Sequence, residues 1–186
     1  MREIKFRAKI KAESLEQKLA MLMGTNCKPQ NEGVWVYGDI RLQGIIPYIH
    51  NEIGKCPIDV STIGQFTGLK DKNGKDIYEG DIIRYTDVKT FCVNPDCDLH
   101  LQFSQTYACV EEDVVIFKNG MFTMANDYYI RPLCYYGIED LEDLRNCLGV
   151  KDGENEDING TIIDDSLLGL KVIGNIHDNP ELLKGE

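Results

Sequence analysis

The segment from Gln65 to Tyr85, QFTGLKDKNGKDIYEGDIIRY, constrains the fold more than any other part of the chain. Asn73-Gly74 supplies two residues that tolerate positive φ, as a two-residue type I′ turn requires. Strand-forming residues flank this dipeptide, and Gly80 permits a second sharp turn before Ile82. The sequence therefore predicts a tight β-hairpin that is followed directly by a third strand.

The same segment has some features of a phosphate-binding loop, because Gly68 precedes Gly74-Lys75. A P-loop has four residues between its glycines and a serine or threonine after its lysine. Here five residues separate the glycines, and the lysine is followed by Asp76, which would repel phosphate. The pattern therefore favours a hairpin and argues against nucleotide binding at this place.

Other segments extend the β pattern. Apolar and basic residues alternate from Ile4 to Lys11, which predicts a strand with one buried face and one basic face. Asn119-Gly120, between two apolar runs, predicts a second hairpin. Capping residues and apolar spacing predict short helices over residues 14–24 and 139–148. We predict a mainly β (α+β) fold, mostly antiparallel, with two peripheral helices.

Length and composition indicate in which cellular compartment the protein is found. The chain has 186 residues and lacks an apolar run of about 18 residues, which a membrane-spanning helix needs. Its charged, alternating N-terminus is unlike a secretory signal peptide. We therefore expect the protein to remain inside the cell, where the seven irregularly spaced cysteines are reduced thiols.

The net charge of −11 is unevenly distributed along the chain. Residues 1–84 carry 13 lysines and arginines against 11 acids, whereas residues 85–186 carry 7 against 20. An acidic chain is repelled from nucleic acid unless it has a local basic face. This asymmetry is the best indication in the sequence of where a partner would bind.

Three separated segments carry a further pattern: REIKFRA at Arg2–Ala8, the stretch Gln65–Ile83, and VIGNI from Val172 followed by NPEL from Asn179. In this order and placement they resemble the YopX family of phage-encoded proteins over the full length of the chain. The family often continues its first strand with Trp-Asp, where this chain has Lys9-Ile10.

The resemblance implies a small SH3-like antiparallel β-barrel built around the middle segment, and an origin in a phage or prophage. It implies no activity, because the family has no established biochemical function and no catalytic residues. We expect a single YopX-like domain. Its N-terminal strands and an inserted helix occupy residues 1–60, its barrel core residues 61–130 and 168–178, and an insertion with a helix and an acidic loop residues 138–160.

Cysteines and a histidine cluster between the two predicted hairpins. Cys92, Cys97 and His100 follow the spacing C-x4-C-x2-H, and Cys109 lies further along. Thiolates and imidazole are ligands that Zn²⁺ prefers, and four such groups can close a structural site. The spacing lacks the C-x2-C form, so a loop with free thiols and a surface histidine is the alternative.

The basic face of the first strand is the candidate nucleic-acid contact. Its residues are Lys5, Arg7, Lys9 and Lys11. Such a face can line phosphates, and aromatic residues on adjacent strands would add base stacking. A solvated strand face, or lysines that protect a sheet edge from aggregation, is the alternative interpretation.

Signatures of catalysis are missing from the sequence: it contains no H-E-x-x-H, no G-x-S-x-G and no Rossmann glycine fingerprint. We therefore expect a non-enzymatic accessory protein without a cofactor, working as a β module that binds another protein. Self-association through exposed strand edges is a further expectation. The alternatives are a nucleic-acid-binding protein that uses the basic strand and a structural zinc protein.

Overall fold

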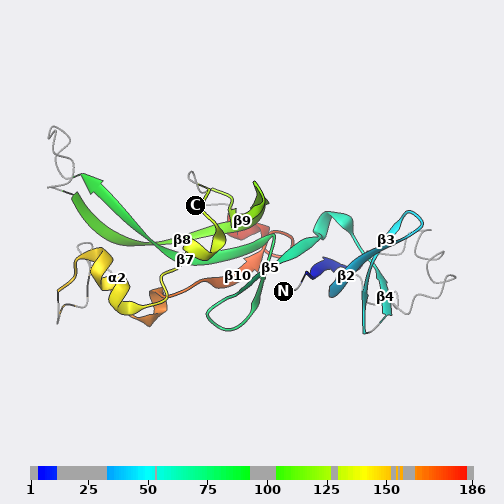
Figure 1. The fold of residues 1–186 in the computed structure, drawn as a ribbon, viewed down its shortest axis with the longest axis horizontal. Coiled ribbons are helices and arrows are strands. Elements are labelled where there is room, and N and C mark those ends of the chain that lie inside the picture. Colours follow the sequence, from blue (N-terminus) through cyan, green and yellow to red (C-terminus); the bar gives the residue numbers. More distant parts are fainter. Residues whose placement is uncertain are drawn as a thin grey trace. The chain divides into compact units, whose positions relative to one another are not determined.

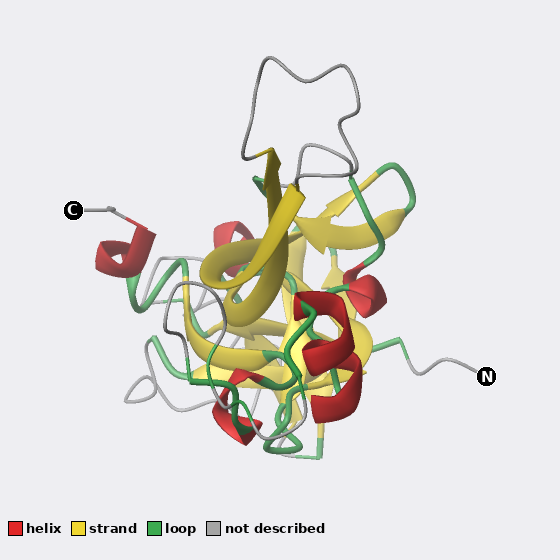
Figure 2. Cartoon of the chain, turned by 90° about the vertical axis from the view of Figure 1, so that its left-hand side faces the viewer, coloured by secondary structure: helices red, strands yellow, loops and turns green. Residues whose placement is uncertain are grey.

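A computed structural model describes residues 4–11, 33–52, 54–92, 104–126, 130–151, 154, 156 and 162–183. Within them the chain forms ten strands, one α-helix and four short 3-10 helices, so the predicted mainly β class is confirmed (Figure 1, Figure 2). No helix in these ranges is both long and apolar enough to cross a membrane. The helix predicted over residues 14–24 lies outside the described residues.

The chain divides into two compact units. Unit 1 comprises Met1–Leu69 and Asp76–Gly80, and unit 2 comprises Lys70–Lys75 and Asp81–Glu186. Each unit contains one antiparallel sheet. The strands of the central hairpin are therefore counted with unit 1 and its turn with unit 2.

Unit 1 is a six-stranded sheet in the order β4-β3-β2-β1-β5-β6. The first strand lies inside this sheet and pairs with both β2 and β5. The strands are β1 (Phe6–Lys9), β2 (Trp35–Gln43), β3 (Ile46–Asn51), β4 (Gly54–Pro57), β5 (Gly64–Lys70) and β6 (Asp76–Tyr78). A 3-10 helix, η2 (Val60–Thr62), joins β4 to β5.

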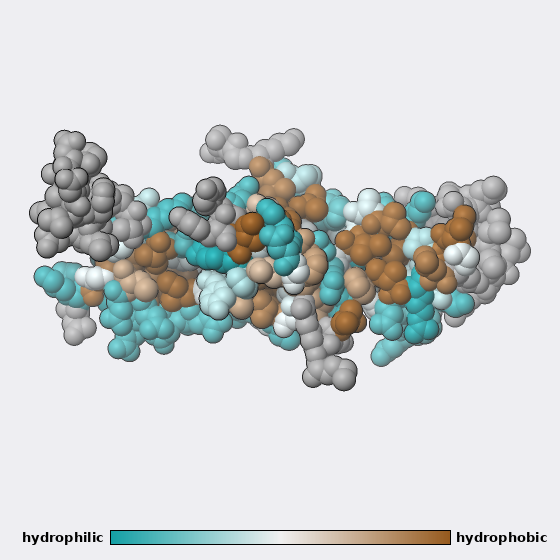
Figure 3. Space-filling model, turned by 45° about the horizontal axis from the view of Figure 1, so that its top comes forward, coloured by the Kyte–Doolittle hydropathy of each residue, from teal (hydrophilic) through white to brown (hydrophobic). Residues whose placement is uncertain are grey.

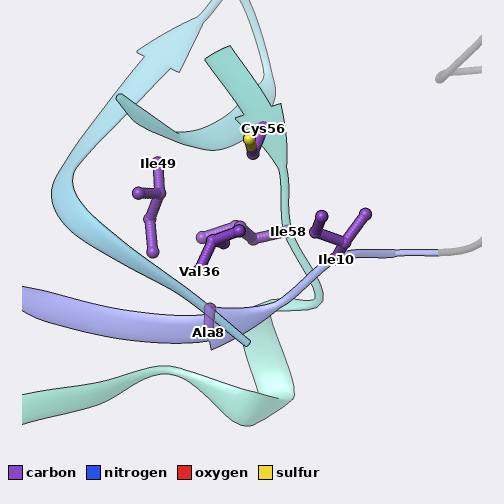
Figure 4. Close-up of a cluster of buried hydrophobic side chains, with 6 residues drawn as sticks. All are labelled: Ala8, Ile10, Val36, Ile49, Cys56 and Ile58. Carbon is purple, nitrogen blue, oxygen red and sulfur yellow. The ribbon is translucent and has the colours of Figure 1, made fainter. Parts of the chain in front are cut away.

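The core of unit 1 lies on one face of this sheet. Ala8 of β1 and Ile10, just after this strand, are buried as predicted. Ile4 is 63% exposed and Arg7 is only 5% exposed, so the predicted alternation of a buried and a basic face holds only in part. Ala8 and Ile10 pack in a cluster with aliphatic residues from the neighbouring strands (Figure 4). The six members of the cluster are Ala8, Ile10, Val36, Ile49, Cys56 and Ile58.

The cysteines correct one sequence expectation. Cys56, only 1% exposed, is disulfide-bonded, and its partner lies outside the side chains that the structure describes. The expectation of seven reduced thiols is therefore wrong for Cys56, because irregular spacing along the chain does not show which sulfur atoms meet in the fold. Cys109, Cys134 and Cys147 are free thiols, as expected.

The central segment forms the predicted hairpin, but with a different turn. Asn73 keeps a negative φ and only Gly74, at φ +81°, is left-handed. The amide of Gly74 donates to the carbonyl oxygen of Asp71 at 2.9 Å, and the amide of Asp71 donates to that of Lys75 at 2.8 Å. The turn therefore has three residues between its last paired positions, and the two-residue type I′ prediction is wrong here.

Unit 2 is a four-stranded sheet in the order β10-β7-β8-β9. Its strands are β7 (Asp81–Cys92), β8 (Ser104–Lys118), β9 (Met121–Met124) and β10 (Lys171–Asn175). Asn119 and Gly120 have φ of 53° and 82° and join β8 to β9, so the second predicted hairpin is confirmed with its type I′ geometry. The 3-10 helices are η3 (Leu133–Tyr135), η4 (Asp165–Leu167) and η5 (Pro180–Leu183).

The helix α2 (Leu141–Leu148) confirms the second predicted helix. The Asp140 carboxylate accepts hydrogen bonds from the amides of Glu142 and Asp143, and Gly149, at φ +68°, ends the helix in the left-handed conformation. Leu144 and Leu148 are buried and pack in a cluster with Ala108 of β8. The helix therefore covers part of the unit 2 sheet.

Neither sheet closes on itself among the described residues, since β4 and β6 bound one ladder and β10 and β9 the other. The SH3-like barrel implied by the family resemblance is not confirmed. The central hairpin pairs with β1, whereas β10 pairs with β7, and the expected barrel core of residues 61–130 and 168–178 stays a prediction. That the two units together form a single domain stays a prediction.

Candidate functional site

The predicted basic face lies on the side of the unit 1 sheet opposite its aliphatic core. In the register of β1 with β2, Arg7 is paired with Tyr37 and Lys9 with Trp35. Residues directly opposite each other in a ladder project from the same face of the sheet. Cations and aromatic side chains from adjacent strands are therefore brought together, as the nucleic-acid interpretation requires.

Arg7 is the centre of this arrangement and is only 5% exposed. Its guanidinium carbon lies 4.6 Å from the ring centre of Trp35 and 4.9 Å from that of Tyr78. Its Nη2 donates to the carbonyl oxygen of Glu79 at 3.3 Å. The same carbonyl oxygen would lie 2.4 Å from a Cβ at position 64, so only glycine fits there. The backbone of residue 79 thus covers this part of the face.

Lys5 is half-buried and paired. Its Nζ lies 2.5 Å from a carboxylate oxygen of Asp76 and 4.6 Å from the ring centre of Phe66. The hydrogen bond to Asp76 raises the pKa of Lys5 above its ordinary value. Burial raises the pKa of the neighbouring Tyr78, although the positive charge of Lys5 opposes that shift. The ammonium group is thus held by groups of its own unit.

The remaining two residues are more accessible. The Nζ of Lys9 lies 5.5 Å from the ring centre of Trp35, and Lys11 is exposed. The four predicted contact residues therefore share a strand, but they range from buried Arg7 to exposed Lys11. Sequence analysis missed Phe66 and Tyr78 as their partners. The only sign was an aromatic residue on each strand of the central hairpin.

A second surface of unit 1 is apolar. On β2, Ile40 packs against the aliphatic core, and Leu42, two residues further on the same face, is 70% exposed. Ile45, in the turn from β2 to β3, is 89% exposed. We call Leu42 and Ile45 the β2–β3 turn surface. Figure 3 shows that apolar side chains reach the surface of the molecule.

The proposed zinc ligands are not all brought together. Cys92 ends β7 opposite Ser104, whereas Cys109 lies on β8 opposite Asp87. Five residues of extended β8 separate the two places, a span of about 17 Å. One zinc ion with Zn–S bonds of about 2.3 Å cannot reach both sulfurs. The structure thus separates Cys109 from the position of Cys92, and zinc binding by the other predicted ligands stays a prediction. Cys97 and His100 lie outside the described residues.

The Cys109 thiol has a different partner. Its Sγ donates to Glu111 Oε1 at 3.1 Å, and the same oxygen accepts a hydrogen bond from Lys89. Burial first, and then the carboxylate of Glu111, raise the pKa of Cys109 above its ordinary value. Little thiolate therefore forms at neutral pH. Among the side chains that the structure describes, no three potential metal ligands cluster.

Comparisons with known proteins identify the family. A crystal structure of protein EF1440 from Enterococcus faecalis is similar to this chain at 22% sequence identity. The alignment covers 99% of this chain and 100% of that one, with a TM-score of 0.39. No curated protein matches. The family described as YopX protein matches residues 5–184, nearly the whole chain. The chain therefore belongs to the YopX family.

Proposed function

We propose that this protein is a non-enzymatic accessory protein of a phage or prophage that binds another protein in the cytoplasm of the bacterial host. The observation that supports this proposal is the β2–β3 turn surface. There the apolar face of β2 extends beyond the aliphatic core of unit 1 and is exposed. Unit 1 would supply the binding surface through Leu42 and Ile45.

The sheet geometry explains why this surface is apolar. Ile40 lies opposite Ile49, which is fully buried, and Leu42 lies opposite Pro47 on the same face. The apolar row of β2 and β3 thus continues for one more pair beyond the buried cluster. Large apolar residues that gather at an exposed turn are typical of protein interaction sites. The partner in this proposal presents an apolar segment that covers Leu42 and Ile45.

A double variant, Leu42→Asp with Ile45→Asp, tests this function. Wild-type and variant proteins are expressed in the host, and the proteins that co-purify in stoichiometric amount are quantified. We expect a partner with the wild type that is lost with the double variant. The matched control is Val60→Asp, because Val60 belongs to unit 1 and is 60% exposed but lies on η2.

Three outcomes would count against the proposal. They are recovery of no stoichiometric partner, equal recovery with the double variant, and equal loss with Val60→Asp. Light scattering of the purified protein tests for self-association. If the wild type is a dimer and the double variant a monomer, the protein that binds to this surface is a second copy of the same chain.

A second candidate function is binding of single-stranded nucleic acid. The observation that favours it is that Lys9, Trp35 and Tyr37 share one sheet face, with Tyr37 47% exposed. Fluorescence anisotropy with single-stranded DNA and RNA at increasing salt tests it. Tyr37→Ala and Lys9→Gln should each weaken binding, because they remove a stacking ring and a phosphate contact. Absence of binding at low salt discards this candidate.

The SH3-like barrel of the family resemblance is kept as a part of the proposal. The placement of β1 between β2 and β5 supports it, since this strand joins the N-terminal strands and the central hairpin into one ladder. A partner that binds to the turn surface does not require the ladder to close.

A further inference from the structure

Unit 2 contains a cavity of about 320 Å³ that carries three cations. Lys72 comes from the turn of the central hairpin, Arg84 from β7 and Lys171 from the first position of β10. Val110 and Leu167 also line the cavity, and Val110 lies opposite Thr86, which projects from the same face of β7 as Arg84. The cavity therefore combines cationic and apolar side chains.

The fold places these cations close together. Arg84 and Lys171 are directly opposite each other in the pairing of β7 with β10. The amide of Lys72 donates to the carbonyl oxygen of Leu170 at 2.9 Å, which fixes the hairpin turn beside the start of β10. Like charges directly opposite in a ladder are destabilising. An anion bound between Arg84 and Lys171 would therefore relieve the repulsion of their charges.

The neighbouring groups only partly neutralise these charges. Nε and Nη2 of Arg84 both donate to Glu112 Oε1, at 2.8 and 2.5 Å. The Nζ of Lys72 donates to the carbonyl oxygen of Ser166 at 2.9 Å. The Lys171 side chain makes no hydrogen bond or ion pair within the described part of the chain. Asp164, another carboxylate near this place, accepts from the amide of Ser166 and is not in the cavity wall.

We propose that Lys72, Arg84 and Lys171 bind the phosphate group of a small phosphorylated molecule whose organic part lies against Val110 and Leu167. Two carboxylates lie near the three cations: Glu112 pairs with Arg84, and the pKa of Asp164 is lowered first by hydrogen bonds from Ser166 and also by the charge of Lys72. The cations still outnumber these two acids. A phosphate monoester carries a charge of about −1.5 to −2 at neutral pH, whereas a carboxylate carries only one. Arg84 supplies a planar fork of donors and the lysines supply point charges, a combination suited to phosphate. The cavity is also larger than a phosphate group needs.

Titration calorimetry of the full-length protein at constant ionic strength tests this site, which is independent of the β2–β3 turn surface. The probes are inorganic phosphate, phenyl phosphate and benzoate. We expect saturable binding of phosphate, tighter binding of phenyl phosphate and no binding of benzoate. Lys171→Gln should weaken phosphate binding about tenfold, since a charge-assisted hydrogen bond is lost. Lys171→Arg should restore binding, and Lys118→Gln, at the end of β8, should leave it unchanged.

A stability measurement separates this role from a structural one. Lys171→Gln removes the repulsion with Arg84, so the variant should unfold at a higher temperature than the wild type without phosphate. It should also lose the phosphate-induced shift in unfolding temperature. The proposal is overturned if phosphate has no saturable effect on the wild type, or if Lys118→Gln weakens binding as much as Lys171→Gln. Binding of single-stranded DNA without binding of either phosphate probe would likewise overturn it.

Discussion

The carboxylate of Asp71 accepts a hydrogen bond from the backbone amide of Val172, which lies 101 residues further along the chain, at a distance of 3.2 Å. Its other oxygen accepts from the amides of Asn73 and Lys75, at 2.8 and 2.9 Å. Asp71 is only 6% exposed. One buried carboxylate therefore shapes the turn of the central hairpin and ties it to strand β10 within unit 2.

Asp71→Asn should destabilise unit 2. An amide side chain has one acceptor oxygen where a carboxylate has two, so at least one of the three backbone amides loses its acceptor. We expect the free energy of unfolding to fall by about 2 kcal/mol, the usual cost of a buried donor left unsatisfied. Urea denaturation measures this change. Glu139→Gln, which alters an exposed acid of the same unit, is the control. Equal midpoints for Asp71→Asn and the wild type would contradict the assigned role.

The same carboxylate predicts a pH dependence. Burial acts to raise the pKa of Asp71, but the hydrogen bonds from Lys75, Val172 and Asn73 outweigh it and hold the pKa below its ordinary value. Because the folded-state pKa is lowered, the stabilisation is present above the unfolded value of about 3.9 and is lost as pH falls through the folded value. As the pH is lowered from neutral, the free energy of unfolding should therefore fall less steeply for Asp71→Asn than for the wild type. Equal slopes for the two proteins at acid pH would exclude this contribution of Asp71.

The two Asn-Gly turns show how far local sequence predicts this fold. Asn119-Gly120 forms the two-residue turn expected from its type, with both residues at positive φ. Asn73-Gly74 does not, because the side chain of Asp71 accepts the amide of Asn73 and draws the turn into a wider form. Both hairpins were predictable from dipeptide chemistry. The wider turn was not, since its carboxylate is also held by the distant amide of Val172.

The candidate sites likewise contain residues that could be predicted from the sequence and partners that could not. Alternation along the first strand placed Arg7 on the basic face, but its stacking partner Tyr78 is brought in only by the pairing of β1 with the central hairpin. Lys72 and Arg84 lie in the same central segment, but Lys171 is far from both along the chain, and nothing in its local sequence relates it to them. The three residues share a cavity because β10 pairs with β7 in one particular register.

Arg7→Gln should lower the stability of unit 1. The substitution removes the contacts of the guanidinium with the Trp35 and Tyr78 rings and its hydrogen bond to the Glu79 carbonyl oxygen. We expect a loss of about 2 kcal/mol, because cation–π and hydrogen-bond contributions are lost together at a buried site. Trp35 is the only tryptophan of the chain, so its fluorescence in urea follows unit 1 directly. The control is Lys11→Gln, which changes an exposed cation next to the same strand. Similar curves for both variants would show that Arg7 does not stabilise the sheet.

Gly64→Ala should also destabilise unit 1, for a steric reason. A Cβ at this position would lie 2.4 Å from the Glu79 carbonyl oxygen, so the backbone of residue 79 must move. We expect a cost of about 3 kcal/mol, the upper range for inserting a methyl group into a packed site. Gly44→Ala is the matched control. Nothing lies within 4 Å of its added Cβ, so only the strain of its left-handed φ of +63° remains, a cost of about 1 kcal/mol. Tryptophan fluorescence in urea distinguishes the two, and equal losses would contradict the close approach at Gly64.

Cys109→Ser should leave the zinc content of the purified protein unchanged. The register of β7 with β8 separates Cys109 from the position of Cys92 by about 17 Å, so one ion cannot bind both. Elemental analysis of the wild type, Cys109→Ser and Cys97→Ser, purified in parallel, decides the point. A zinc site built from Cys92, Cys97 and His100 would lose its metal in Cys97→Ser and keep it in Cys109→Ser. Loss of zinc in Cys109→Ser would mean that the two strands do not pair in this register. The exposed thiol of Cys134 makes Cys134→Ser a control for nonspecific metal binding by free thiols.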